Sequence, residues 1–229
     1  MTSLADACRD GGVRYSAIED ILLQIEGDEH NPYGGINDQD KYGESAMRWI
    51  CSHGRSDLLK LLPEYKANVK CLNDLGQTPL HAACWNTHVE CCKILLSSEA
   101  EINLKDRDGC TSLHKVRFCD YILIFKSFLT HTQAAWKGNK DIVTLLIQAG
   151  AMIDEEDANG ATPLHYASVQ GHEAIVSLLL SRGAKVQHCD KKAISAIQRA
   201  TTSGRLEVVK ILLNKNADLE ATDPHGECR

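Results

Sequence analysis

The chain has 229 residues with 25 basic and 31 acidic side chains, which gives a formal net charge of −6. It has no Lys/Arg cluster, so it lacks the basic face expected of a nucleic-acid-binding protein. Its first residues lack the basic stretch and apolar run of a signal peptide. Its most apolar window, 118–129, is shorter than the roughly 20 residues that a membrane helix needs. We therefore expect neither a nucleic-acid partner nor a membrane partner.

The ten cysteines indicate a reducing compartment, because no secretion signal accompanies them. We expect a cytoplasmic protein, with the nucleus as the alternative. No Cys-x-x-Cys pair of the kind that builds zinc sites occurs in the sequence. The sequence therefore predicts no metal site and no cofactor.

One turn residue recurs along the chain at a constant interval. The series is Gly43, Gly76, Gly109, Gly160, Ala193 and Gly226. Successive members are 33 residues apart, except that the step from Gly109 to Gly160 is longer by 18 residues. A fixed period of this size indicates one small structural unit copied along the chain.

Residues 1–39 follow this period less well. The stretches 4–11 and 18–23 fit a first helix with its stop and a second helix, and 27–39 fits a loop because it holds proline and glycine. We interpret 1–39 as a degenerate N-terminal capping repeat and loop, because the end of a repeat array needs a polar outer face.

From residue 40 onward each repeat predicts a pair of helices. Thr or Ser stands where a helix N-cap is needed, and Pro79 and Pro163 follow at the first helical position, where a missing N–H costs nothing. The first helix should stop at Gly54, Gly138, Gly171 and Gly204, with Thr87 as a strained substitute in the second unit. A second helix follows, with apolar residues at the i, i+3, i+4 spacing of a buried stripe.

The segment 160–167 reads Gly-Ala-Thr-Pro-Leu-His-Tyr-Ala, and a Gly-His step and a leucine-rich second helix follow it. These motifs resemble the ankyrin repeat, with the best copy from Asp157 to Asp190 and a resemblance that runs from about residue 40 to 229. The resemblance implies an all-α solenoid of stacked helix-turn-helix units with β-hairpin-like turns. It places the units near 40–72, 73–105, 106–156 with the insert 116–133, 157–189 and 190–222, with a truncated unit at 223–229.

The insert 116–133 interrupts a first helix, because removing it would join Lys115 to Ala134 in a normal helix pattern. Its apolar core, 121–125, is strongly β-prone and would favour aggregation if exposed. We favour a retained short intron or gene-model artefact, since the flanking residues can be encoded across splice signals. The alternative is a real loop that binds a partner, and transcript reads across the segment distinguish the two.

The histidines, cysteines and one tryptophan have structural interpretations. The resemblance implies that His81, His114 and His165 bond the neighbouring turn, and no nucleophile with a positioned base is specified, so we expect no catalytic residue. The pair 91–92 replaces apolar residues of other repeats and should pack in the core. Cys110 is expected at an exposed hairpin, and Trp49 is expected in the core.

The candidate partner-binding residues lie where the resemblance places the concave groove and the hairpin tips. Trp85 and Trp136 share one inner-helix position, and tryptophan is enriched in interface hot spots. Packing of each indole on an adjacent repeat is the open alternative. The candidates are Trp85, Asn86, Trp136, Lys137, Tyr42, Asp74, Leu75, Arg107, Asp108, Ala158 and Asn159.

The resemblance implies a non-catalytic scaffold or adaptor that binds another protein, with no small-molecule substrate. The alternative is a regulatory or targeting segment of a larger enzyme or signalling protein, since the sequence stops three residues after Gly226, inside a unit. A third hypothesis is membrane association through residues 121–129. The sequence identifies neither the partner nor the oligomeric state.

Overall fold

The computed structural model describes residues 37–61, 67–116 and 131–218, and within 131–139 it describes the backbone only. The chain divides into two compact units, Met1–Ile102 and Asn103–Arg229. The expected capping repeat and loop (up to residue 36), the core of the insert and the truncated last unit lie outside the described residues. Within the described residues, no helix has the length and apolar character to cross a membrane.

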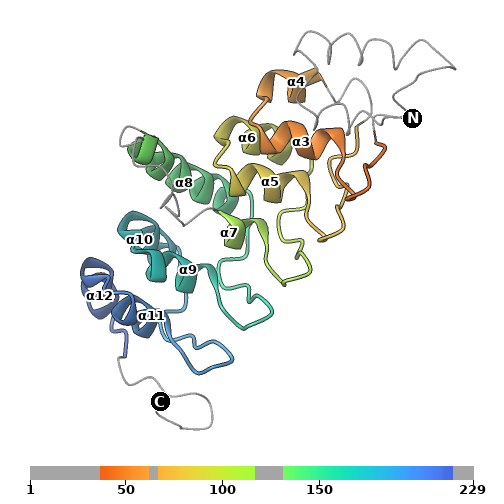
Figure 1. The fold of residues 1–229 in the computed structure, drawn as a ribbon. Coiled ribbons are helices and arrows are strands. Elements are labelled where there is room, and N and C mark those ends of the chain that lie inside the picture. Colours follow the sequence, from red (N-terminus) through yellow and green to blue (C-terminus); the bar gives the residue numbers. More distant parts are fainter. Residues whose placement is uncertain (1–36, 62–66, 117–130, 219–229) are drawn as a thin grey trace, which may run out of the picture. The chain divides into compact units, whose positions relative to one another are not determined.

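The first unit packs helices in two rows. The inner helices α3 (Ala46–Ser52) and α5 (Pro79–Trp85) lie side by side, as do the outer helices α4 (Ser56–Leu61) and α6 (Val89–Ser97) (Figure 1). The largest fully buried side chains of this unit are Ile50, Leu58, Leu59, Leu80 and Leu95. Each contributes roughly 1.5–3 kcal/mol to folding by leaving water, so burial between neighbouring repeats holds the rows together.

The second unit repeats this arrangement. Its inner helices are α7 (Ser112–Lys115), α9 (Pro163–Gln170) and α11 (Ala196–Thr202), and its outer helices are α8 (His131–Gln148), α10 (Glu173–Ser181) and α12 (Leu206–Leu213). Neighbours in each row pack together, and the hairpins that precede α9 and α11 project to the same side (Figure 1). The predicted all-α stack of helix-turn-helix units with hairpin-like turns is confirmed within each unit.

The predicted helix starts are confirmed. Thr78, Thr162 and Ser195 are N-caps of α5, α9 and α11, and each belongs to a capping box with the residue three positions later. Pro79 and Pro163 begin their helices. In each box two backbone N–H groups at the start of the helix find side-chain acceptors, which fixes where these three inner helices begin.

The predicted stop after the first helix is also confirmed in three repeats. Gly54, Gly171 and Gly204 have φ values of 70°, 84° and 67°. Thr87 takes the same left-handed conformation with φ 61°. A β-branched residue is strained there, because its Cβ approaches the following carbonyl oxygen.

The third repeat departs from the prediction. Its inner helix α7 ends at Lys115 after one turn, and Val116 fills the buried position that alanine holds in the neighbouring repeats. Gly138 does not end a first helix, because α8 runs unbroken from His131 to Gln148. The insert separates 134–138 from α7, so these residues extend the outer helix instead of completing the inner one.

The insert nevertheless leaves the repeats in register. Lys185 N donates to Asp154 Oδ1 across 31 residues, and the equivalent bond from Met152 N to Asn103 Oδ1 spans 49. The bond from His165 to the next repeat spans 29 residues and the equivalent bond from His114 spans 47, which is again a difference of 18. The described contacts between the repeats on either side of the insert therefore keep the same register as those between repeats without an insert.

We predict that Thr87→Gly stabilises the chain by about 0.5–1 kcal/mol. Glycine relieves the strain of the left-handed conformation in the folded state, and this gain is partly offset because glycine has more backbone entropy in the unfolded state. Urea unfolding measures the change. The neighbouring Asn86 has φ −94°, so Asn86→Gly should destabilise as the matched control. A loss of stability in Thr87→Gly would contradict the strain assigned to this turn.

Candidate functional site

The hairpin before each inner helix, which we call a finger, is closed by one buried acceptor. The fingers are residues 40–45, 73–78, 106–111, 157–162 and 190–195. In the fourth, Asp157 Oδ1 accepts from the N–H groups of Asn159 and Ala161, both at 2.8 Å. The equivalent bonds recur in every finger, with Asn73 as the acceptor in the second. The finger backbone is thus fixed independently of the residues at its tip.

In the second unit an inner-helix side chain adds a further bond to each finger acceptor. Lys115 Nζ lies 2.8 Å from Asp106 Oδ2, Tyr166 donates to Asp157 Oδ2 at 2.7 Å, and Arg199 donates to Asp190. Burial alone would raise the pKa of Asp157. The hydrogen bonds from Tyr166 and two backbone N–H groups outweigh it, so the pKa is lowered. Asp157 therefore stays ionised at neutral pH.

The fingers of the second unit also bond to each other. Ala158 N donates to Asp108 O and Lys191 N donates to Asn159 O, both at 2.9 Å. A Cβ on Gly109 would lie 2.6 Å from Ala158 N. Glycine is therefore required there both for its φ of 76° and for the close approach of the next finger.

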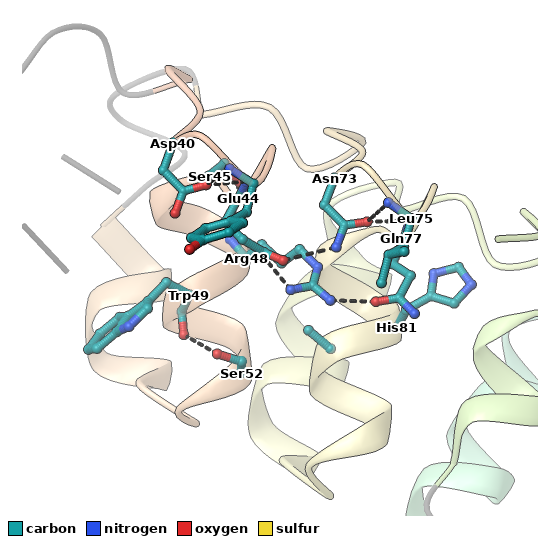
Figure 2. Close-up of polar contacts among 12 residues, drawn as sticks. Asp40, Glu44, Ser45, Arg48, Trp49, Ser52, Asn73, Leu75, Gln77 and His81 are labelled. Atoms are coloured by element: carbon teal, nitrogen blue, oxygen red, sulfur yellow. Dashed lines mark hydrogen bonds and ion pairs between the residues drawn. The ribbon is translucent and has the colours of Figure 1, made fainter. Parts of the chain in front are cut away.

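In the first unit a side-chain network joins the two fingers (Figure 2). Arg48 contacts the Glu44 carboxylate and donates to Gln77 Oε1 at 2.6 Å, while Asn73 Nδ2 donates to Glu44 Oε1 at 2.9 Å. Arg48 occupies the repeat position of the histidines. Arg48 bonds to a side chain of the neighbouring finger, whereas the histidines bond to a backbone carbonyl.

All the predicted tip residues are exposed, and their chemistry differs between the units. In the first unit, Tyr42 and Leu75 stand at the same repeat position and are each 54% exposed, beside the exposed Asp74. In the second unit the exposed tips are polar or small. They are Arg107, Asp108, Ala158 and Asn159.

The tryptophans do not share one environment. Trp85 ends α5 and is 49% exposed, and the adjacent Asn86 is the half-buried C-cap of α5, with Nδ2 donating to Ala82 O. The prediction that Trp136 and Lys137 lie in an inner helix beside it is wrong, because α8 contains both. Trp49 is not in the core as expected. It is half-buried and stacks on His53, with ring centroids 4.1 Å apart.

The structural interpretation of the histidines is confirmed in the second unit. Nε2 of His114 and His165 donates to the carbonyls of Ala161 and Ile194 in the next repeat. Nδ1 faces the N-cap threonine of its own helix. These side chains join neighbouring repeats. Both ring nitrogens are hydrogen-bonded, so neither is available to act as a general base. His81 makes the same Nδ1 contact with Thr78 and is buried.

The cysteines of the first unit form part of the core as predicted. Cys84 and Cys92 are fully buried with their sulfurs 3.8 Å apart, and Cys91 is buried as well. Cys110 is buried too, which corrects the expectation of an exposed thiol. Burial raises the pKa of Cys110 to about 11, so it is a poor nucleophile at neutral pH. The described residues hold no group of three or more His, Cys, Asp or Glu side chains placed for a metal ion.

One site escaped the sequence analysis. A cavity of about 280 Å³ lies between the last two fingers of the second unit, and Tyr166, Lys192 and Arg199 are among its lining residues. Tyr166 and Arg199 stand at one repeat position, as do Asn159 and Lys192. The sequence signal that could have revealed this site is the change from neutral to basic side chains at these two repeat positions.

The family model for ankyrin repeats matches residues 4–106 and 131–223. The matched ranges cover most of the chain, so the protein belongs to the ankyrin repeat family. The unmatched interval between the two ranges, 107–130, contains the insert except for its last three residues. The match also begins at residue 4, within the segment interpreted from the sequence as a degenerate capping repeat.

Similar proteins differ widely in length. The chain is 30% identical over 125 residues to the fowlpox virus ankyrin repeat protein FPV223, covering 48% of this chain and 89% of the relative. It is also 30% identical to human BCL-6 corepressor-like protein 1 over 57% of this chain and to the chicken nuclear factor NF-kappa-B p105 subunit over 56%. It spans only 7% and 12% of those two relatives.

We predict that acidification destabilises the second unit through His165. Burial and the nearby Arg199 charge lower the pKa of His165 to about 4, whereas the unfolded side chain titrates near its usual 6.5. The unfolded chain therefore binds the proton first as pH falls, so stability present above pH 6.5 declines. Between about pH 6.5 and about pH 4.5 the loss is roughly 2 kcal/mol.

His165→Gln tests this directly, because Gln198 makes the same capping box at this position in the next repeat. Urea unfolding as a function of pH should show a flatter slope for His165→Gln. The exposed His53→Gln serves as the control and should retain the wild-type slope. Equal slopes for wild type and His165→Gln would contradict the assignment.

Proposed function

We propose that the protein is a non-catalytic interaction scaffold or adaptor that binds another protein through its finger tips and inner-helix ends. The observation that carries the proposal is the exposure of three large apolar side chains at the finger tips and an inner-helix end of the first unit: Tyr42, Leu75 and Trp85. They stand at finger tips or at an inner-helix end whose backbone is fixed by buried hydrogen bonds. Side chains presented on a fixed backbone lose little entropy on binding, which favours affinity.

Family membership supports this proposal, because ankyrin repeats generally serve as protein-interaction modules and are generally non-catalytic. The polar tips of the second unit, Arg107, Asp108, Ala158 and Asn159, are proposed to extend the surface. Trp136 and Lys137 remain candidates by their sequence only. We propose no cofactor and no small-molecule substrate. We also propose a cytoplasmic or nuclear location, in keeping with the free cysteines of the described residues.

A second candidate is a regulatory or targeting segment of a larger protein. It is favoured by relatives in which the matched region is a small part of the whole. One is a Dictyostelium discoideum protein named as a probable serine/threonine-protein kinase, 27% identical over 66% of this chain and 20% of the relative. Sequencing the transcript beyond the codon for Arg229 distinguishes the two, since a catalytic domain there would favour this candidate.

We predict that Trp85→Ser abolishes capture of the partner while the fold is retained, because Ser52 stands at the same repeat position in the first repeat. The immobilised chain captures proteins from cell extract, and mass spectrometry quantifies them for wild type and variant. Removing a hot-spot tryptophan costs about 2 kcal/mol or more, or roughly thirtyfold in affinity. Circular dichroism checks that helicity is unchanged.

The matched control is Leu206→Ser, which removes another exposed apolar side chain, from outer helix α12. Proteins that survive Leu206→Ser but are lost with Trp85→Ser are partners of the proposed surface. If every captured protein persists with Trp85→Ser and also with Tyr42→Asn plus Leu75→Asn, the first-unit surface is not the binding site.

A further inference from the structure

The cavity between the last two fingers of the second unit is built from charged side chains. It has a volume of about 280 Å³, enough for one or two side chains but small for a cofactor. Its charged lining residues are Asp157 from one finger, Asp190, Lys191 and Lys192 from the next, and Arg199 from α11. Three cations against two anions leave one positive charge in excess.

The two carboxylates are already satisfied within the protein. Asp157 accepts from two backbone N–H groups and from Tyr166 at 2.7 Å. Asp190 accepts from two backbone N–H groups and from Arg199. Their oxygens are therefore occupied in holding the fingers, and they offer little to a basic ligand.

The cations are less completely engaged. Lys191 Nζ donates to the Ala158 carbonyl at 2.9 Å, and Arg199 engages Asp190 through Nη2 of a guanidinium that has five N–H donors. Lys192 is exposed, and its ammonium has no hydrogen bond or ion pair within the part of the chain that the structure describes. What the cavity offers an incoming group is therefore positive charge and N–H donors.

The preceding finger lacks these cations, although Lys115 supplies one at the position of Arg199 in the third repeat. In the preceding repeat, Ala158 and Asn159 stand at the positions of Lys191 and Lys192, and Tyr166 stands at that of Arg199. Tyr166 supports its finger carboxylate without carrying charge. The finger backbone therefore does not require the positive groups, because the preceding finger forms the same hairpin without them.

We propose that this cavity binds a side-chain carboxylate of an acidic segment in a partner protein. The inference rests on the proposed function and specifies the chemistry of its partner. A carboxylate matches the guanidinium fork and the lysine ammonium in both charge and geometry. The whole chain carries a net charge of −6, so the acidic surface elsewhere repels such a segment and the cavity selects its place of binding.

Fluorescence anisotropy of a short labelled peptide of alternating Gly and Glu tests the proposal, with the full chain and with a Gly/Gln peptide as the neutral comparison. The variant Lys192→Asn plus Arg199→Tyr copies the preceding repeat, so the bond to Asp190 can be kept while two charges are removed. The control Lys140→Gln plus Lys210→Gln removes two exposed charges from outer helices.

We expect the Glu peptide to bind, the Gln peptide not to bind, and the cavity variant to weaken binding about tenfold while the control changes it less than about twofold. Tyr166→Arg, which adds a cation at the equivalent position, should strengthen it. Equal binding of both peptides, an equal loss in the control, or no binding by wild type overturns the proposal. Displacement of the peptide by a more tightly bound single-stranded oligonucleotide overturns it as well.

The outcome is separable from that of the proposed function. If the Glu peptide fails while Trp85-dependent capture of a protein partner persists, only the acidic-ligand inference falls. If the peptide binds but no protein partner is captured, the cavity assignment stands and the scaffold proposal falls.

Discussion

Every finger in the described residues depends on one buried acceptor, three residues before the left-handed turn residue. In the last finger, Asp190 is 6% exposed and takes the N–H groups of Lys192 and Ile194. These donors would otherwise be unpaired at the turn, which costs as much as a lost hydrogen bond. Because the acceptor fixes the turn from inside, the outward side chains can change without altering the backbone.

That separation of frame and surface explains how one repeat presents different chemistry in the two units. The tip position holds Tyr42 and Leu75 in the first unit, but Asp108, Asn159 and Lys192 in the second. We propose a different ligand for each unit. Apolar side chains of a partner are proposed for the first unit, and a carboxylate is proposed for the cavity beside the last finger of the second.

Sequence reasoning predicted the parts that local chemistry decides, such as the threonine caps and the strained Thr87. The bonding of the histidines to the neighbouring turn came from the resemblance to ankyrin repeats. Sequence reasoning failed where chain connectivity decides. Trp136 keeps the inner-helix pattern in sequence, yet the insert detaches it from α7 and α8 absorbs it. It also failed for Cys110, whose burial depends on the fold around its finger, and for the cavity at Arg199, which exists only when two fingers lie side by side.

Amide hydrogen exchange at Lys192 and Ile194 tests the central claim most directly. Lys192 lies at an exposed finger tip, yet the N–H groups of both residues donate to Oδ1 of the buried Asp190, at 2.8 Å and 3.0 Å. The account predicts that both exchange at least about a hundredfold more slowly than an unprotected loop amide. Exchange at the unprotected rate in the folded chain would show that the buried carboxylate does not close the finger, and would contradict the account.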